Sequence, residues 1–353
     1  MRRANPASSL CRSSDRAQNS VESVNETEHG PASIKMAQVA KAGPELIASA
    51  AQVLRAGGLV AFPTETVYGL GADATSNEAV AGIYAAKGRP SFNPLIAHVP
   101  DLQSAQVHGV FNADARALAA AFWPGPLTLV VPVQPSCKVS LLARAGLDTL
   151  ALRAPDHPVA QALLRAAGVP VAAPSANRSG RVSPTTAAHV AADLADRIDM
   201  IVDGGACAIG VESTILACID DQVRLLRPGG VSREAIERVL GRALSAAEDG
   251  SSAPIAPGML ASHYAPRALV RLNATHVERG EAALDFGGRF AGHSGLRLDL
   301  SPAGDVREAA AHLFAFLRQL DVPGMSSIAV APVPMTGLGE AVNDRLTRAA
   351  APR

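Results

Sequence analysis

The stretch PTETVYGLGADATSNEAVAGIYAAKGRPSFNPLIAHV, residues 63–99, decides how the chain folds, because strand, turn and helix signals follow one another within it. The apolar run Leu59–Phe62 in front of it predicts a strand. Pro63 ends that strand, because proline has no N–H to donate to a neighbouring strand. Polar residues follow, and Gly69 and Gly71 predict a turn.

A helix is predicted after this turn, over Asn77–Lys87. Thr75 and Glu78 stand at the spacing of a capping box, and Gly88 is a usual residue for a helix C-terminus. The segment therefore indicates a strand, a turn and a helix in succession, which is typical of an α/β protein.

Cationic and polar side chains gather at the end of this helix, at Lys87, Arg89, Asn93 and His98. On a short loop beside a polar strand end, they predict an anion site of the kind that binds a nucleotide phosphate. Two plainer interpretations stay open at this point. PTET can be an ordinary strand-to-turn connection, and Lys87 and Arg89 suit the negative end of the helix dipole.

The composition indicates a globular protein of two domains, with 353 residues of which 48% are hydrophobic. Lys plus Arg and Asp plus Glu each number 32, so the whole chain is not a polyanion binder. Any contact with a nucleotide or nucleic acid therefore needs a local basic site. No uncharged apolar run is long enough to predict a membrane span.

Cysteine usage points to a reducing compartment. Cys11, Cys137, Cys207 and Cys218 form no CxxC pair and have no histidine pair at zinc-ligand spacing near them. We expect free, mostly buried thiols.

Residues 1–36 are rich in Ser, Asn and Arg and nearly lack large apolar side chains, so we expect a disordered N-terminal extension. Its arginines faintly resemble those of a transit peptide. A tail, or translation from Met36, is the interpretation that we favour.

Residues 44–243 alternate short apolar strands with amphipathic helices, which predicts an α/β domain. Helices are expected at Glu45–Ala56, Asn77–Lys87, Asp114–Ala121, His157–Ala167, Thr186–Leu194 and Arg233–Leu240. Strands are expected at Leu59–Phe62, Leu95–Val99, Leu127–Val133, Leu150–Arg153, Pro170–Ala173, Met200–Val202, Thr214–Ile219 and Val223–Leu226. A tight turn at Asp221 and Gln222 would make the last two strands antiparallel.

Residues 244–267 lack periodicity and are rich in Ser, Ala, Pro and Gly, which predicts a linker. Beyond it, strands are expected at Leu269–Leu272, Ala283–Phe286, Leu296–Leu300 and Ile328–Pro332, and helices at Val306–Leu320 and Gly339–Ala349. Their order predicts a small parallel sheet.

A series of short motifs resembles the threonylcarbamoyl-AMP synthases, the YrdC-like family, in that family's order. The motifs are PTETVYGLGADA at 63–74, KGRP at 87–90, NPLIAHV at 93–99, PGPLTLV at 124–130, LALRAP at 150–155, APSANRSG at 173–180, ESTI at 212–215 and LLRPG at 225–229. PGMLASHYAPRA at 257–268 and GLGEAVNDRLTRAA at 337–350 resemble the linker and the end of the C-terminal domain of two-domain members.

This resemblance implies a YrdC-like catalytic domain over residues 37–243, with a twisted mixed sheet, helices and a concave basic face. It implies a linker or lid over 244–267 and a small Rossmann-like α/β domain over 268–353. The implied cytoplasmic reaction converts L-threonine, bicarbonate and ATP into L-threonylcarbamoyladenylate and pyrophosphate. The tRNA threonylcarbamoyl-transfer machinery would take up the product, and weak RNA binding is compatible with this role.

The resemblance also implies residue roles. Arg153 would bind the threonine carboxylate through a bidentate guanidinium, and further threonine contacts would come from Thr66, His98, Ser213 and the backbone of Ala173. The ATP site would be formed by Lys87, Arg89, Asn93, Thr149, Ser175, Ser183, Arg227 and Tyr264, assisted by Asn177 and Arg178. Without the motifs, Arg153 reads as a surface residue, His98 as a structural histidine and Tyr264 as a packing residue between domains.

The implied chemistry relies on positioning and charge neutralisation, with no covalent intermediate. Mg²⁺ would accompany ATP on phosphates and water, without a protein metal cage. The sequence has no GxxxxGK[ST] motif, and PSANRSG is not a GxSxG elbow. Tyr264 would bring the linker over the site as a lid.

Three alternatives stay open. A noncatalytic RNA-binding factor would show strong, salt-dependent RNA binding. A carbamoyltransferase of the hydrogenase-maturation type carries zinc-finger modules, for which this chain lacks suitable cysteine pairs. A family member without synthase activity would keep only the fold. The argument against this alternative is that the segments KGR, SAN, LRAP and HYAP are intact.

Overall fold

The computed structural model describes residues 36–90, 93–220, 222–244 and 263–352. The predicted N-terminal extension, apart from Met36, and most of the predicted linker lie outside these residues, as does Cys11. The domain boundaries stay predictions. Cys207 and Cys218 are buried free thiols and Cys137 is half-buried, as expected.

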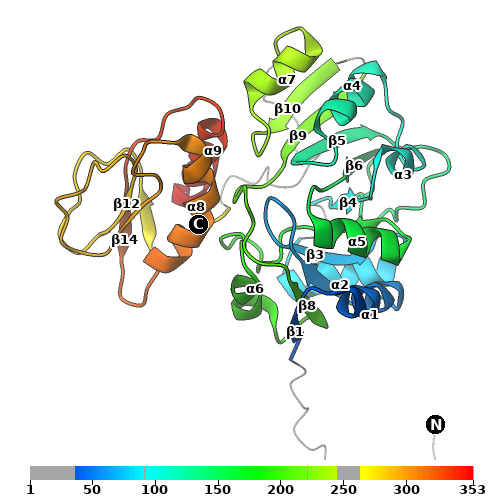
Figure 1. The fold of residues 1–353 in the computed structure, drawn as a ribbon, viewed down its shortest axis with the longest axis horizontal. Coiled ribbons are helices and arrows are strands. Elements are labelled where there is room, and N and C mark those ends of the chain that lie inside the picture. Colours follow the sequence, from blue (N-terminus) through cyan, green and yellow to red (C-terminus); the bar gives the residue numbers. More distant parts are fainter. Residues whose placement is uncertain (1–35, 91–92, 221, 245–262, 353) are drawn as a thin grey trace, which may run out of the picture. The chain divides into compact units, whose positions relative to one another are not determined.

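A ten-stranded mixed sheet organises residues 36–244, which we call the N-terminal part (Figure 1). The strand order is β1-β8-β2-β3-β7-β4-β6-β5-β9-β10. The strands are β1 Gln38–Lys41, β2 Val60–Phe62, β3 Gly69–Asp73, β4 Ile96–His98, β5 Leu127–Pro132, β6 Thr149–Arg153, β7 Val171–Ala172, β8 Met200–Asp203, β9 Thr214–Ile219 and β10 Gln222–Arg227. The predicted antiparallel pairing of β9 with β10 is confirmed.

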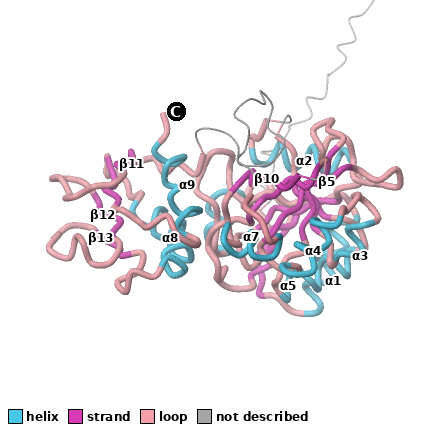
Figure 2. The backbone as a smooth tube through the Cα atoms, turned by 90° about the horizontal axis from the view of Figure 1, so that it is seen from above, coloured by secondary structure: helices cyan, strands magenta, loops and turns pink. Residues whose placement is uncertain are grey.

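Helices cover both faces of this sheet (Figure 2). The helices are α1 Pro44–Arg55, α2 Asn77–Lys87, α3 Leu102–Gln106, α4 Ala113–Phe122, α5 Pro158–Ala167, α6 Ala187–Leu194 and α7 Arg233–Leu240. Leu54 of α1 and Leu163 of α5 pack with Phe62 in one apolar cluster. Ile83 of α2 and Leu118 of α4 belong to another, with Leu129 of β5.

The predicted turn at Gly69 and Gly71 is wrong, because these glycines lie in strand β3, which pairs antiparallel with β2 and β7. The glycines serve close packing of neighbouring chains. A Cβ on Gly71 would lie 2.8 Å from Cε1 of Phe62 and 2.9 Å from Cγ1 of Val171. The space that a side chain would fill is therefore occupied by buried apolar residues of the adjacent strands.

The start of α2 also differs from the predicted capping box. Ser76 is the N-cap, and its hydroxyl accepts a hydrogen bond from the backbone N–H of Ala79 at 3.1 Å. Thr75 instead donates to the carboxylate of Asp73 at 2.8 Å. The predicted end is confirmed, since Gly88 adopts the left-handed conformation that suits glycine.

A four-stranded parallel sheet organises residues 263–352, which we call the C-terminal part, and confirms the predicted small parallel sheet. Its order is β11-β14-β12-β13. The strands are β11 Leu269–Arg271, β12 Ala282–Asp285, β13 Arg297–Asp299 and β14 Ser327–Val330, and the helices are α8 Val306–Leu320 and α9 Gly339–Ala350. In the described part of the chain, no helix combines the length and apolar character needed to cross a bilayer.

The two parts pack into one compact unit, Lys35–Arg353. Val67, Val182 and Val211 of the N-terminal part join the apolar cluster that contains Phe314 of α8. Gly210 approaches α8 so closely that a Cβ there would lie 2.4 Å from the carbonyl oxygen of Ala310. This packing leaves no room for a side chain at position 210.

Gly210→Ala should destabilise the protein by about 2 kcal/mol more than Gly205→Ala, because the added methyl group overpacks a backbone contact. Gly205 is a matched control from the same loop, since its φ is also positive, at 88°, and a Cβ there would meet no atom within 4 Å. Urea denaturation of both variants measures the difference. Equal losses of stability would show that α8 can move away from the loop without cost.

Candidate active site

A cavity opens between the ends of several strands of the large sheet, and it is lined by three guanidinium groups. These belong to Arg89, Arg153 and Arg227. The remaining lining residues are Thr64, Val67, Gly69, Ile96, His98, Ala173, Pro174, Ser175, Glu212, Ser213, His263 and Tyr264. Glu212 is the carboxylate that faces the cavity within the described residues, so the wall is predominantly cationic.

Strand register explains why residues far apart in sequence meet here. Strands β4 and β6 are parallel, and His98 pairs with Arg153 at their carboxyl ends. Strand β7 runs antiparallel beside β4 and leads into Ala173 and Ser175. Because like ends of parallel strands meet at one edge of a sheet, these side chains converge.

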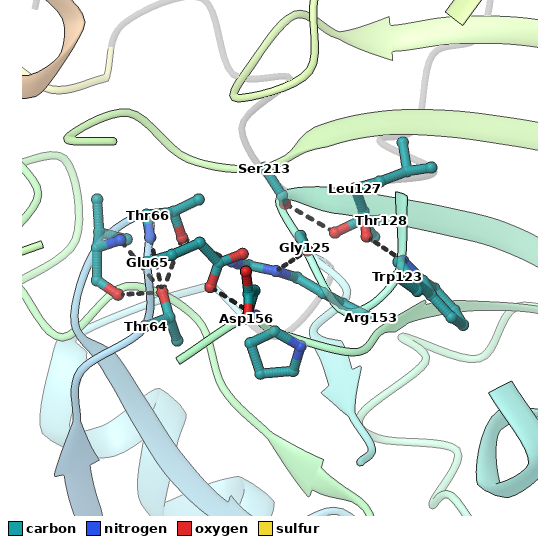
Figure 3. Close-up of polar contacts among 12 residues, drawn as sticks. Thr64, Glu65, Thr66, Trp123, Gly125, Leu127, Thr128, Arg153, Asp156 and Ser213 are labelled. Carbon is teal, nitrogen blue, oxygen red and sulfur yellow. Dashed lines mark hydrogen bonds and ion pairs between the residues drawn. The ribbon is translucent and has the colours of Figure 1, made fainter. Parts of the chain in front are cut away.

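Arg153 is held in place by the PTET segment (Figure 3). Its Nη2 donates to Oε1 of Glu65 at 2.7 Å and to Oγ1 of Thr66 at 2.8 Å. Glu65 in turn accepts from the backbone N–H of Asp156 at 3.1 Å. Both members of the ion pair are buried, so the arginine is fixed by charge and by hydrogen bonds.

One nitrogen of this guanidinium is left for a ligand. Nε of Arg153 lies 3.4 Å from the carbonyl oxygen of Gly125, and Nη2 is occupied by Glu65 and Thr66. Within the described residues, Nη1 has no hydrogen-bond partner. Since Arg153 lines the cavity, Nη1 is available to an anionic group there, whereas the bidentate contact that was predicted would need a nitrogen already engaged by Glu65, Thr66 or Gly125.

His98 is a buried, neutral histidine at the cavity wall. Burial, together with the charge of Arg153, lowers the pKa of His98 to about 3. Its Nδ1 lies 3.2 Å from the carbonyl oxygen of Ile96. A carbonyl oxygen accepts, so this contact places a proton of the neutral ring on Nδ1.

Ser213 and Arg227 also line the cavity. The Ser213 hydroxyl lies 2.7 Å from Oγ1 of Thr128 (Figure 3). Nη2 of Arg227 donates to the carbonyl oxygen of Ser213 at 2.9 Å and to its hydroxyl at 3.2 Å. Burial lowers the pKa of Arg227.

The KGRP segment contributes Arg89 to the wall and Lys87 behind it. Arg89 donates to the backbone carbonyls of Asn93 and Pro94, and burial lowers its pKa to about 10. Lys87 is buried, and its ammonium donates to the carbonyl oxygens of Ser175 and Asn177, each at 2.5 Å. Burial and the charge of Arg89 lower the pKa of Lys87 well below its usual value. Lys87 thus fixes the SAN loop.

Tyr264 closes one side of the cavity and is 1% exposed. Its ring stacks on Phe314 of α8, with 5.5 Å between the centroids. Its φ of 62° is unusual for a residue with a side chain, and such strain persists only where the surroundings hold it. The ring packs on Phe314 and Arg345, which agrees with the plainer interpretation of a packing residue, and its contact with the nucleotide stays a prediction.

Most of the predicted site residues line the cavity, but the structure separates some of them from it. Thr66, Lys87, Asn93 and Ser183 are buried behind the wall and hold its residues or loops. Ser183 is engaged by Oε1 of Glu212 at 2.6 Å. Thr149 lies at the opposite end of β6 from Arg153, paired with Pro132, and does not line the cavity.

Sequence reasoning missed Glu65, Glu212 and His263. Glu65 lies in PTET and Glu212 in ESTI, so an acidic residue inside each motif was the available signal. His263 precedes Tyr264 in the HYAP segment, and burial lowers its pKa to about 3. The ion-pair partners of Glu65 and Glu212, Arg153 and Arg345, lie 88 and 133 positions away in sequence, so spacing alone does not reveal these pairs.

Comparisons with known proteins agree with this architecture. Residues 52–229 match a family model described as telomere recombination, and residues 231–351 match one described as the threonylcarbamoyl-AMP synthase C-terminal domain. A threonylcarbamoyl-AMP synthase of Bacillus subtilis (strain 168) is 45% identical over 327 residues, covering 87% of this chain and 93% of that protein. Another, from Pyrococcus abyssi (strain GE5 / Orsay), is 43% identical over 321 residues, covering 85% and 92%.

A solved structure gives the same result in three dimensions. The crystal structure of P. abyssi Sua5 complexed with L-threonine matches with a TM-score of 0.81 at 38% identity, covering 89% of this chain and 97% of that one. The similarity extends over both sheets and is not confined to the motifs around the cavity. This chain belongs to the threonylcarbamoyl-AMP synthase family.

Proposed function

We propose that Arg153 binds the carboxylate of L-threonine, and that Arg89 and Arg227 bind the phosphates of ATP in the same cavity. The observation that carries this proposal is the unpartnered Nη1 of a buried, cavity-lining arginine whose Nη2 is held by Glu65 and Thr66. An arginine fixed in this way binds a carboxylate without reorganising.

As a member of its family, the chain synthesises L-threonylcarbamoyladenylate from L-threonine, bicarbonate and ATP. The threonine amine attacks the bicarbonate carbon, and loss of water gives an N-carboxylate. An oxygen of this carboxylate then attacks the α-phosphorus of ATP, and the bond to the β-phosphate oxygen breaks to release pyrophosphate. Negative charge grows on the departing pyrophosphate, which the cavity arginines Arg89 and Arg227 are suited to neutralise.

The side chains around the cavity support the remaining roles. Ser213 and neutral His98 offer hydrogen bonds to the threonine hydroxyl, and the backbone at Ala173 lies beside them. Ser175 and Tyr264 belong to the nucleotide side, and Asn177 and Arg178 continue the same loop. Lys87, Asn93, Thr66 and Ser183 hold these groups from behind the cavity wall, and with Thr149 they stay proposed contacts of the bound substrates.

Mg²⁺ would enter with ATP. Glu212 is the cavity's acidic residue within the described part of the chain, and its two oxygens are engaged by Ser183 and Arg345. Mg²⁺ keeps several waters and is commonly bound through substrate phosphates, so the donor set here fits a metal carried by the nucleotide.

We also propose that the product passes to the tRNA threonylcarbamoyl-transfer machinery in the cytoplasm. The buried free thiols of Cys207 and Cys218 are compatible with a reducing compartment. Weak RNA binding is part of the same proposal.

Pyrophosphate release from ATP should require bicarbonate and should be stimulated far more by L-threonine than by L-valine. Valine has nearly the same shape but lacks the hydroxyl, and a site that hydrogen-bonds a hydroxyl rejects such an analogue strongly. L-Serine should work weakly, because one methyl group is worth about 1–3 kcal/mol. Equal stimulation by threonine and valine would contradict the assignment of the threonine site.

Arg153→Gln should raise KM for threonine by roughly tenfold to a hundredfold, the value of a lost charge-assisted hydrogen bond, with KM for ATP nearly unchanged. Arg89→Gln should do the reverse. Arg165→Gln, at an exposed arginine of α5, is the matched control and should resemble the unaltered protein. Steady-state pyrophosphate release with each substrate varied measures both constants. If Arg153→Gln affects ATP as strongly as threonine, the two subsites are wrongly assigned.

Because the pKa of His98 is about 3 in the folded protein and near 6.5 when unfolded, the unfolded chain binds the extra proton between these pH values. Folding stability therefore falls as the pH decreases below 6.5. One such histidine lowers the free energy of unfolding by about 2 kcal/mol between pH 7 and pH 5. Other buried histidines add to this loss of stability, so the unaltered protein is compared with His98→Gln. The free energy of unfolding of the variant should fall by about 2 kcal/mol less over the same pH interval. Urea denaturation at both pH values decides, and identical pH dependence in the two proteins would refute a neutral His98.

A further inference from the structure

Arg345 lies on α9 of the C-terminal part, within the segment GLGEAVNDRLTRAA, and it is completely buried. An arginine without any exposure is rare and needs strong partners. Its position in the last helix of the chain, far in sequence from the cavity residues, gives no reason to expect a role in the active site.

The guanidinium of Arg345 nevertheless reaches the N-terminal part. Nε donates to Oε2 of Glu212 at 2.8 Å, and Nη2 donates to the carbonyl oxygen of Pro228 at 3.0 Å. Nη1 donates to Asp344 on its own helix at 2.5 Å. The central carbon of the guanidinium lies 5.1 Å from the centroid of the Tyr264 ring, in the range of a cation–π contact.

Two of these partners, Glu212 and Tyr264, line the cavity. Glu212 also accepts from Ser183 at 2.6 Å, and Arg345 and Arg227 lower the pKa of Glu212 to about 2 against the opposing effect of burial. Pro228 directly follows Arg227, another wall residue. A single side chain of the C-terminal part therefore contacts two residues of the cavity wall and the residue that follows a third, on the side that we assign to the nucleotide.

Other charged contacts between the two parts avoid the cavity. Arg233 of α7 donates to Glu340 of α9 at 2.6 Å, and Arg318 of α8 pairs with Asp193 at 2.6 Å. None of these residues lines the cavity. Arg233 and Arg318 therefore join the two parts without contacting the cavity wall, in contrast to Arg345.

We propose that Arg345 is a positioning residue for the nucleotide side of the active site, through which the C-terminal part fixes Glu212 and Tyr264 in the cavity wall. This inference rests on the proposed function, because it uses the assignment of that side to ATP. Arginine is required there, because one planar group serves Glu212, Asp344 and the Pro228 carbonyl while facing an aromatic ring.

Arg345→Lys tests the proposal while keeping the positive charge beside Glu212, so that no unpaired buried carboxylate is left. The compact ammonium group of the lysine side chain cannot donate to Glu212, Asp344 and the Pro228 carbonyl at once. We expect KM for ATP to rise roughly tenfold, as for one lost charge-assisted contact, and KM for threonine to change less than about twofold. Asp344→Asn, which touches Arg345 but not the cavity, should shift KM for ATP in the same direction and by less.

Glu340→Gln is the matched control, since it removes a charged contact of α9 with the N-terminal part without touching the cavity. All proteins are assayed well below their unfolding temperatures. Hydrogen exchange over residues 263–268 is measured in parallel without substrates, and Arg345→Lys should speed exchange there relative to Glu340→Gln. Lower thermal stability with unchanged KM for ATP and unchanged exchange would overturn the proposal and leave Arg345 a purely structural residue.

The two measurements separate this inference from the proposed function. If the unaltered protein releases no pyrophosphate under any condition, the proposed function fails, and the hydrogen exchange alone decides whether Arg345 holds Tyr264. If the unaltered protein is active and Glu340→Gln impairs ATP use as much as Arg345→Lys, any contact between the parts suffices and the proposal is wrong.

Discussion

Four buried arginines around one cavity, Arg89, Arg153, Arg227 and Arg345, are the constraint on which the rest of the structure depends. Removing a guanidinium from water is costly unless acceptors replace the lost hydration. Each of the four has such acceptors: backbone carbonyls for Arg89, Glu65 with Thr66 for Arg153, Ser213 for Arg227, and Glu212 with Asp344 for Arg345. The motifs around the cavity supply these acceptors as much as they supply ligand contacts.

Because of this constraint, hydrogen bonds within the protein hold the arginines of the wall in place without a ligand. The acidic partners Glu65 and Glu212 sit behind or beside the arginines and leave cationic groups facing inward. Charge that is already oriented stabilises an anionic transition state without reorganisation at the moment of reaction. We propose that the same arrangement supplies the phosphate and carboxylate contacts of the reaction, and Arg345 ties the C-terminal part to Glu212 through a buried charge.

Periodicity in the sequence was enough to predict the elements but not their partners. Helices α2 and α7 were predicted with their observed bounds, and in the structure Gly88 ends the first and Ser232 caps the start of the second. Strand β3 was missed, since glycine in Gly69–Asp73 reads as a turn unless the side chains of neighbouring strands are known. Strand β1 and the short α3 were missed as well.

The prediction of site residues from the sequence was limited in a similar way. Arg153 and Arg227 could be found from their motifs, whereas Arg345 could not, because its partner Glu212 lies 133 positions away in sequence. Thr149 was assigned to the ATP site from the family resemblance, and its contact with ATP stays a proposal. A strand advances about 3.3 Å per residue, so the five residues of β6 place Thr149 and Arg153 at opposite ends.

A crystal structure with L-threonine and a nonhydrolysable ATP analogue tests the account most directly. The account predicts the threonine carboxylate within hydrogen-bond distance of Nη1 of Arg153, with the pair to Glu65 intact, and the phosphates between Arg89 and Arg227. A carboxylate bound elsewhere, or one that displaces Glu65 from Arg153, would contradict it.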